Sequence, residues 1–161
     1  MAAALAMAAT GAVAAESSYR LLGQTAPDFA LKATSGTNFR LSENRGEVML
    51  LTFWSSRCGQ CAAQLASLSR LVDTYRSAGL AALAVSVDDD TVAAARYAIA
   101  HPVSFPVLLD PDKEIARTYR VDNLPMLLLI DRSGAIRHVH RDYRSGDEKA
   151  LLERIKPLLD E

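Results

Sequence analysis

The chain has 161 residues, of which 50% are hydrophobic and 23% charged, and its formal net charge is −1. This composition excludes intrinsic disorder, and the lack of a basic excess argues against a nucleic-acid partner. Two cysteines are too few for a disulfide-rich scaffold, and no apolar run reaches the roughly 18 residues that span a bilayer. We therefore expect a globular monomer without stable membrane insertion.

The amino end, residues 1–15, is almost entirely alanine and is followed by polar residues. Cleavage after Ala14 or Ala15 would follow small residues, which is typical of the end of a secretory signal. The basic n-region of such a signal is missing, because no Lys or Arg precedes Arg20. We expect either the remnant of a signal peptide, with a periplasmic or otherwise exported mature protein, or an alanine-rich disordered tail. The even composition of residues 19–161 predicts a single domain.

Turn residues and apolar runs define the expected elements. The first is a hairpin, formed by residues 26–31 and 37–41 around a turn that contains Gly36. The uninterrupted apolar run 48–54 predicts a strand that is buried on both faces. The remaining expectations, in chain order, are a helix at 59–77, a strand at 80–87, a helix at 91–100, a strand at 105–109, a helix at 112–119, strands at 126–130 and 135–140 joined by a glycine turn, and a helix at 146–159.

This order of elements predicts the topology. Strand–helix–strand units imply parallel pairing with right-handed crossovers, whereas the hairpins add antiparallel strands. We therefore expect an α/β fold with a mixed central sheet, helices on both faces and a hairpin near the amino end.

The two cysteines occur together as Cys58-Gly59-Gln60-Cys61, where the buried strand ends and a helix begins. Free N–H groups and the dipole at a helix N-terminus stabilise an anion, so we expect Cys58 to be an exposed thiolate nucleophile. Cys61 returns to the same helical face and is placed to attack a mixed disulfide at Cys58. Two core cysteines, or half of a zinc site, are the alternatives, but zinc needs four ligands. We expect no metal and no cofactor besides a redox-active Cys58–Cys61 disulfide.

Four segments carry a family resemblance. From residue 22 onward the chain resembles the thioredoxin superfamily, and more closely its exported TlpA/ResA-like branch. This resemblance implies a thioredoxin-like three-layer α/β/α fold and a thiol-disulfide oxidoreductase. It also implies protein thiols or disulfides as substrates, an upstream thiol electron donor, and action as a reductant. The segments are residues 23–29, 53–61, 105–110 and 121–131.

The resemblance also assigns residues around the sulfurs. Pro125 corresponds to the family's cis-proline, which faces the two cysteines, and the backbone of Leu124 would pair with an extended substrate strand. Trp54 is expected to pack beside the sulfurs and shield them. Gly59 and Gln60 complete the active-site loop.

Two departures from the family pattern lie next to the first cysteine. Arg57 stands where the family usually has Trp, and a fixed cation there would lower the pKa of Cys58 unless it points into solvent. Gln60 replaces the usual proline, which changes the stiffness of the dipeptide between the cysteines.

Two further departures concern proton transfer. Gln64 and Ala66 replace the Glu and Pro of the TlpA/ResA-like pattern, and Thr52 replaces the buried acid of the wider superfamily. A glutamine can orient a water molecule but cannot accept a proton in place of a carboxylate. We therefore expect slow resolution by Cys61 at neutral pH, or its deprotonation through water.

Two other functions fit parts of the sequence. The segment 26–29 also resembles the peroxiredoxin/AhpC-TSA family, but Ser55, Ser56 and Arg57 replace the Pro and Thr that orient a peroxide there. A copper-delivery module would use thiolate ligands with a wider cysteine spacing and a histidine, which neither His138 nor His140 supplies convincingly.

Two polar clusters are expected to be structural. Asp88-Asp89-Asp90 lacks the spacing of a calcium loop and predicts a solvated turn in which Asp90 caps the following helix. His138 and His140 share one face of a strand, and we expect both to face solvent.

Overall fold

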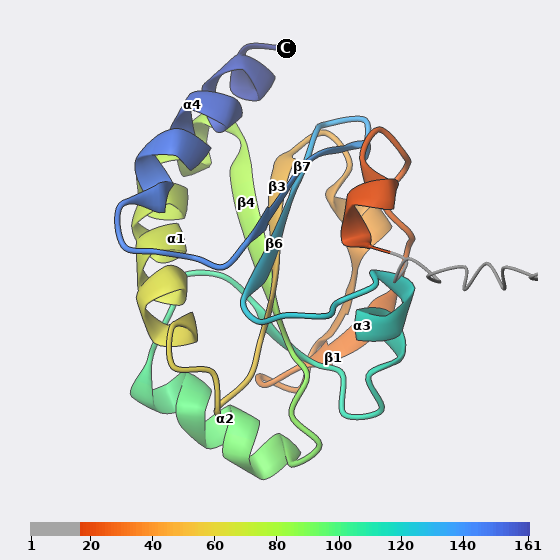
Figure 1. Cartoon of the computed structure of the whole chain (residues 1–161), viewed down its shortest axis with the longest axis vertical. Helices are drawn as coiled ribbons and strands as arrows, with labels where there is room; N and C mark the ends of the chain where they lie inside the picture. The colour runs from red at the N-terminus through yellow and green to blue at the C-terminus, as the bar shows by residue number, and fades with distance from the viewer. Residues whose placement is uncertain (1–16) are drawn as a thin grey trace, which may run out of the picture.

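The computed structural model describes residues 17–161, so the predicted export signal over residues 1–15 lies outside the described residues. A central sheet runs through the molecule and helices lie against it (Figure 1). The strands are β1 (Ala30–Ala33), β2 (Asn38–Arg40), β3 (Val48–Trp54), β4 (Leu80–Ser86), β5 (Val107–Leu109), β6 (Met126–Ile130) and β7 (Ile136–Arg141). The helices are α1 (Cys61–Tyr75), α2 (Thr91–Ala100), α3 (Glu114–Thr118) and α4 (Asp147–Asp160), with 3-10 turns η1 (Ser18–Leu21), η2 (Leu41–Asn44) and η3 (Arg76–Ala78).

The sheet has seven strands in the order β2-β1-β5-β4-β3-β6-β7. The pairs β3–β4 and β4–β5 are parallel, and the β1–β2 and β6–β7 hairpins are antiparallel, as the element order predicts. The central strand β3 also pairs antiparallel with β6, and all seven of its residues are buried. The continuous apolar run 48–54 is therefore explained by a strand with neighbours on both sides and helices or loops on both faces.

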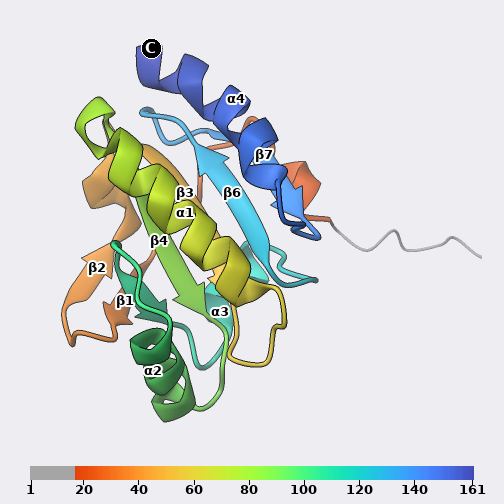
Figure 2. The ribbon, with the colours of Figure 1, turned by 90° about the vertical axis from the view of Figure 1, so that its left-hand side faces the viewer.

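Helices and turns cover the two faces of the sheet unequally. Helices α1 and α4 lie side by side across one face, and α2 covers the β5 end of that face (Figures 1 and 2). The opposite face is covered by the five-residue α3 and by the segment before β3, which includes η1. Alternate β3 residues accordingly enter different apolar clusters: Leu50 and Trp54 pack toward α1, whereas Leu51 and Phe53 pack toward α3.

The aspartate run 88–90 and the pair His138 and His140 are both expected to face solvent, and the structure confirms this for Asp90 but not for the histidines. Asp90 caps α2 as expected, because its carboxylate accepts hydrogen bonds from the N–H groups of Val92 and Ala93 at 2.9 and 3.1 Å. The expectation that His138 and His140 face solvent is wrong: both are half-buried, because α4 packs over their face of β7.

The histidine pair is part of the contact between α4 and β7. His140 Nε2 lies 3.0 Å from Asp147 Oδ2 in the first turn of α4. Burial lowers the pKa of His138 to about 4, and the charges of Arg154 and His140 add to the effect. These contacts tie the helix to the edge strand.

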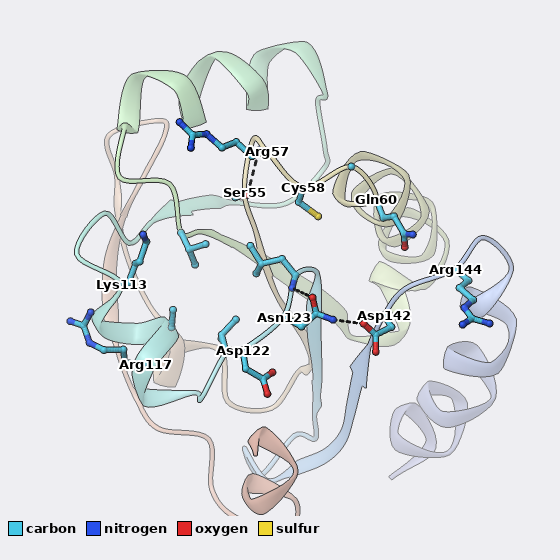
Figure 3. Close-up of a pocket in the computed structure, with 15 residues that line it drawn as sticks. Ser55, Arg57, Cys58, Gln60, Lys113, Arg117, Asp122, Asn123, Asp142 and Arg144 are labelled. Atoms are coloured by element: carbon cyan, nitrogen blue, oxygen red, sulfur yellow. Dashed lines mark hydrogen bonds between the residues drawn. The ribbon is translucent and has the colours of Figure 1, made fainter. Parts of the chain in front are cut away.

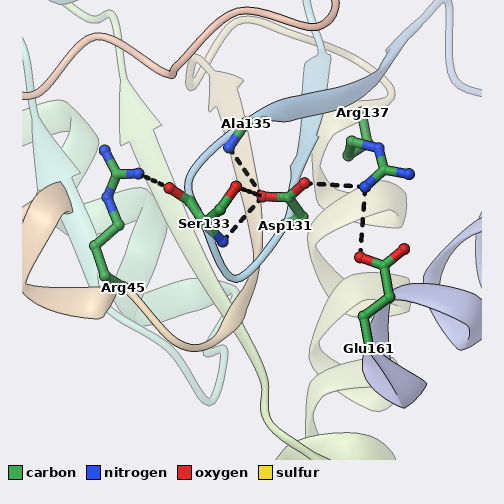
Figure 4. Close-up of polar contacts among 6 residues, drawn as sticks. All are labelled: Arg45, Asp131, Ser133, Ala135, Arg137 and Glu161. Carbon is green, nitrogen blue, oxygen red and sulfur yellow. Dashed lines mark hydrogen bonds and ion pairs between the residues drawn. The ribbon is translucent and has the colours of Figure 1, made fainter.

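The β6–β7 turn is organised by one buried carboxylate (Figure 4). Asp131 Oδ1 accepts hydrogen bonds from Ser133 N, Ser133 Oγ and Ala135 N at 3.0, 2.6 and 3.0 Å, and Oδ2 accepts one from Arg137 at 3.0 Å. The turn's glycine, Gly134, has φ of 89°, the positive value that the predicted glycine turn requires. Burial raises the pKa of Asp131, but the hydrogen bonds from Ser133, Ala135 and Arg137 outweigh it and lower the pKa below 3.8.

The Asp131→Asn variant tests this arrangement. It replaces an ionised acceptor with an amide whose N–H₂ group meets the same donors, so we expect a loss of about 1–3 kcal/mol in the free energy of unfolding at pH 7. Because the pKa of Asp131 is lowered in the folded state, its contribution is present above pH about 4 and is lost as the pH falls through the folded-state pKa. Urea unfolding between pH 7 and pH 2.5 measures both effects.

The control is Asp160→Asn, which changes an exposed carboxylate near the end of α4. The parent and this control should lose stability more steeply than Asp131→Asn as the pH falls. Parallel curves for all three proteins would contradict the role given to Asp131.

Candidate active site

The two cysteines form a disulfide at the start of α1. Their Cα atoms lie 5.4 Å apart, and the Cys61 side chain is fully buried whereas Cys58 is partly exposed. The helix begins at Cys61, so the predicted start at residue 59 is two residues early. The reason is a turn: Cys58 N–H donates to the carbonyl of Ser55 at 3.2 Å, and the Cys58 carbonyl accepts from Cys61 N–H at 3.3 Å.

This turn leaves Cys58 just ahead of the amino end of a 15-residue helix. The N–H groups of a first helical turn have no partner within the helix, and the helix dipole is positive at that end. Both effects favour a thiolate at Cys58 over a thiol when the disulfide is reduced.

Asp88 holds the turn before the cysteines in place. Its carboxylate accepts hydrogen bonds from Ser56 N and Ser56 Oγ at 2.9 and 2.8 Å, and from Ser86 Oγ at 2.9 Å. The expectation that this part of the aspartate run is a solvated turn is therefore wrong for Asp88. Parallel pairing of β3 and β4 brings their carboxyl ends together, and that tertiary fact places Asp88 beside Ser56.

Trp54 lies beneath the cysteine turn, at the end of β3. It is only 1% exposed and belongs to the apolar cluster that contains Cys61 and contacts Cys58. Its indole stacks on the ring of Tyr97 in α2, with ring centroids 5.1 Å apart. The sequence analysis missed Tyr97, because nothing in the spacing along α2 distinguishes it from an ordinary partly buried position.

Cys58 opens into a groove with a volume of about 920 Å³ (Figure 3). Besides Cys58, four of the predicted site residues line it, namely Arg57, Gly59, Gln60 and Leu124, and its other walls come from α3 and from the loops before β6 and α4. The sequence analysis missed the charged and polar residues of these walls. They are Lys113, Arg117, Asp122, Asn123, Asp142 and Arg144.

The loop before β6 carries the predicted proline. Pro125 is buried, and the Leu124–Pro125 peptide bond is cis, as the resemblance implies. The N–H of Leu124 is not open to a substrate strand, because it donates to Asn123 Oδ1 at 2.9 Å. Asn123 is held in turn by Asp142, to which its Nδ2 donates (Figure 3).

Positions 52 and 64, where the resembled proteins carry an acidic residue, hold the neutral side chains of Thr52 and Gln64 here. Gln64 is 1% exposed and Thr52 is fully buried, and Thr52 Oγ1 donates to Gln64 Oε1 at 2.7 Å. Within residues 17–161, Gln64 Nε2 has no hydrogen-bond partner. Gln64 also lines a cavity of about 10 Å³, together with Ser67 and Tyr143. That volume is about the size that one water molecule needs.

Neither a metal-binding cluster nor a membrane-spanning helix occurs in the part of the chain that the structure describes. Residues 17–161 hold no group of three or more His, Cys, Asp or Glu side chains arranged to bind a metal ion. Every helix in the same range is too short or too polar to cross a membrane.

The chain is similar to known redox proteins. A model of the AhpC/TSA family matches residues 22–139. The thiol-disulfide oxidoreductase ResA of Geobacillus kaustophilus is 31% identical over 137 residues, which is 84% of this chain and 79% of that protein. A Chlorobium tepidum structure assigned as the thiol:disulfide interchange protein DsbE superposes with a TM-score of 0.82 at 34% identity, covering 86% of this chain and 97% of that one.

A more distant structure shows the same fold. The exposed lipoprotein thioredoxin Etrx1 of Streptococcus pneumoniae superposes with a TM-score of 0.72 at 25% identity, over 82% of this chain and 100% of the other. The family match spans most of the described residues, and the cysteine pair stands where a buried strand leads into a helix. The chain therefore belongs to the AhpC/TSA family and, within the thioredoxin superfamily, to its ResA-like branch.

Proposed function

We propose that this protein is a thiol-disulfide oxidoreductase that reduces disulfides in protein substrates in an exported compartment. The observation that carries the proposal is the unequal exposure of two bonded sulfurs, with Cys58 at an open groove and Cys61 fully buried. The similarity to the thiol-disulfide oxidoreductase ResA supports the reaction class, and we infer the reducing direction from the resemblance to the TlpA/ResA-like branch. The alanine-rich start of the sequence and the exposed lipoprotein Etrx1 support export.

The reaction starts from the reduced pair. The Cys58 thiolate attacks one sulfur of the substrate disulfide, which forms a mixed disulfide and releases the other substrate sulfur as a thiolate. Cys61 then loses its proton and attacks Cys58 Sγ. The Cys58–Cys61 disulfide forms, the second substrate sulfur leaves as a thiolate, and two electrons have passed to the substrate. A partner dithiol must reduce the pair again before the next cycle.

The site residues have distinct proposed roles in this cycle. The positive end of α1 stabilises the Cys58 thiolate, whereas the exposed Arg57 side chain extends away from Cys58 (Figure 3). Asp88 and Trp54 hold the turn that presents it. Gly59 and Gln60 shape the groove wall, and Leu124, which precedes the buried cis-Pro125, forms the opposite side, where a substrate strand would lie.

Single-cysteine variants test the order of attack. Cys61→Ser should accumulate a mixed disulfide at Cys58 with a disulfide-containing peptide, because nothing remains to resolve it. Cys58→Ser should not accumulate one, because Cys61 is buried. Mass spectrometry of acid-quenched reactions identifies the adduct, and an adduct at Cys61 would contradict the proposal.

Two further measurements complete this test. The reduction potential of the parent pair should lie nearer to the roughly −270 mV of thioredoxin than to the roughly −120 mV of DsbA. Equimolar hydrogen peroxide should not convert Cys58 rapidly to the sulfenate, because Ser55, Ser56 and Arg57 stand where a peroxidase orients its oxidant. Rapid stoichiometric sulfenate formation would favour the peroxidase instead.

Gln64→Glu tests how Cys61 loses its proton. A buried glutamate has a raised pKa and acts as a base near neutral pH, and a placed general base typically contributes about 10²–10⁴-fold. We expect resolution of the mixed disulfide at pH 7 to accelerate at least about tenfold. In the parent, the resolution rate should keep rising toward pH about 8.5, the ordinary pKa of a thiol.

The matched control is Gln64→Met, which fills similar volume without an acid or an amide. It should keep the steep rise of rate with pH. The measurement is single-turnover stopped flow from pH 5.5 to pH 9.5, and identical pH profiles for the parent and Gln64→Glu would refute the role of this position.

Asn123→Ala tests whether the Leu124 N–H is normally withheld from substrate. Removing the side chain frees this N–H to donate to a substrate carbonyl. One added hydrogen bond stabilises by about 0.5–1.5 kcal/mol, so we expect kcat/KM for a peptide disulfide to rise about 2- to 12-fold. The readout is the ratio of kcat/KM for a peptide disulfide to that for hydroxyethyl disulfide, which has no backbone to pair. Asp142→Ala is the control, because it leaves Asn123 Oδ1 in place and should change the ratio less. An unchanged ratio in Asn123→Ala would show that Leu124 N–H does not bind substrate.

A further inference from the structure

The groove at Cys58 is more cationic than the chain as a whole. The full chain has 18 Lys and Arg against 19 Asp and Glu. The groove lining, in contrast, contains four basic side chains and two acidic ones. The excess is therefore a property of this surface and does not follow from the net charge. The basic residues are Arg57, Lys113, Arg117 and Arg144, and the acidic ones are Asp122 and Asp142.

Several of these charges are already paired. Lys113 Nζ lies 2.8 Å from Asp89 Oδ1, and Asp122 forms an ion pair with Arg141, which lies outside the lining. Asp142 accepts a hydrogen bond from the amide of Asn123, which supplies no opposite charge. Each of the two ion pairs is neutral in sum, so neither contributes net charge to the groove.

Three guanidinium groups of the lining form no ion pair among the described residues, although the charge of Arg57 acts on the nearby Asp89. Arg57, Arg117 and Arg144 are exposed, and within residues 17–161 their side chains form no hydrogen bond or ion pair. Together with Asp142, they leave the groove with two more unpaired positive than negative charges. Arg57 and Arg117 lie on the same side of Cys58 as Lys113, whereas Arg144 lies across the groove near Asp142 (Figure 3). Three of the four basic residues of the lining therefore lie on the side formed by the Cys58 turn and α3, next to the carboxylates of Asp88 and Asp89.

Arg117 in α3 and Lys113 at the N-cap of that helix stand on a backbone that hydrogen bonds hold in place. Asp110 is buried, and its carboxylate accepts hydrogen bonds from Ile115 N at 3.3 Å and Ala116 N at 2.9 Å. Arg117 N–H donates to the Lys113 carbonyl at 3.0 Å, so these two residues lie one helical turn apart. A fixed row of cations costs less ordering entropy on binding than side chains on a mobile loop.

We propose that the groove selects disulfides flanked by acidic residues, with the acidic segment of the substrate lying along Arg57 and Arg117. This inference rests on the proposed exchange with protein disulfides and adds the chemical class of the substrate. Complementary charge of this kind acts mainly on the encounter rate and on partner choice. Guanidinium groups are also suited to bidentate pairing with carboxylates.

Matched peptides test the proposal. Three peptides share one cyclic disulfide core and carry Glu, Gln or Lys on both flanks. The reduced full chain is mixed with each peptide, and oxidation is followed through the fluorescence of Trp54, the only tryptophan. At low salt we expect the Glu peptide to react at least about tenfold faster than the Lys peptide. The ratio should fall toward one near 1 M salt, where the Debye length is about 3 Å.

Variants separate the groove from the rest of the surface. Arg117→Glu should reduce the Glu-to-Lys rate ratio at least about threefold. Lys156→Glu makes the same change in net charge on α4, away from the groove lining, and should leave the ratio as in the parent. Arg117→Gln is a second, milder variant and should reduce the ratio in the same direction. A ratio compares peptides on one protein, so any change in Cys58 reactivity cancels.

The possible outcomes distinguish failure of the acidic preference from failure of the proposed thiol-disulfide exchange. If the parent reduces none of the three peptides, the proposed function fails. If it reduces all three at similar rates, the function stands and the acidic preference is wrong. Equal losses of selectivity in Arg117→Glu and Lys156→Glu would attribute the preference to net charge and overturn the role of the groove.

Discussion

The site depends on a difference in burial between two sulfurs that are covalently bonded to each other. Cys61 begins α1 and is packed in the apolar cluster between that helix and the sheet, whereas Cys58 stays in the turn outside it. The fully buried strand β3 makes this possible, because it leads the chain out of the core directly beneath the turn. A substrate can then reach one sulfur only, and the helix terminus favours charge on that sulfur.

Hydrogen bonds from distant parts of the sequence make this arrangement rigid. Asp88, at the end of β4, fixes the turn after β3 through Ser56 and Ser86. Across the groove, Asp142 holds Asn123, which occupies the N–H of Leu124. Both sides of the groove are thus held by polar contacts between neighbouring strand ends, in addition to the packing of Cys58 against the cluster of Trp54.

Two neutral polar side chains, Thr52 on β3 and Gln64 in the first turn of α1, lie within the mostly apolar interior beneath the cysteines. Thr52 donates a hydrogen bond to the Gln64 carbonyl oxygen, whereas the Gln64 amide nitrogen has no partner within residues 17–161. A neutral pair avoids the desolvation penalty that a buried carboxylate pays. Its chemical consequence is that a proton leaving Cys61 has no carboxylate acceptor at these two positions.

The sequence by itself determined the order and type of nearly every element, the mixed sheet, the cysteine pair and its family, because these follow from local signals: apolar period, turn residues and the spacing of two cysteines. It also placed Arg57, Gln64 and Leu124 in the right region through the resemblance. Only the tertiary structure decided that α4 covers His138 and His140 and that Asp88 accepts hydrogen bonds from Ser56. It also decided that the Asn123 side chain accepts a hydrogen bond from the N–H of Leu124. It alone gathered the cations of α3 and of the loop before α4 around Cys58. Those contacts depend on which segments lie next to each other in the folded sheet. The hydrophobic pattern or motif of one segment does not show which side chains of a distant segment will contact it.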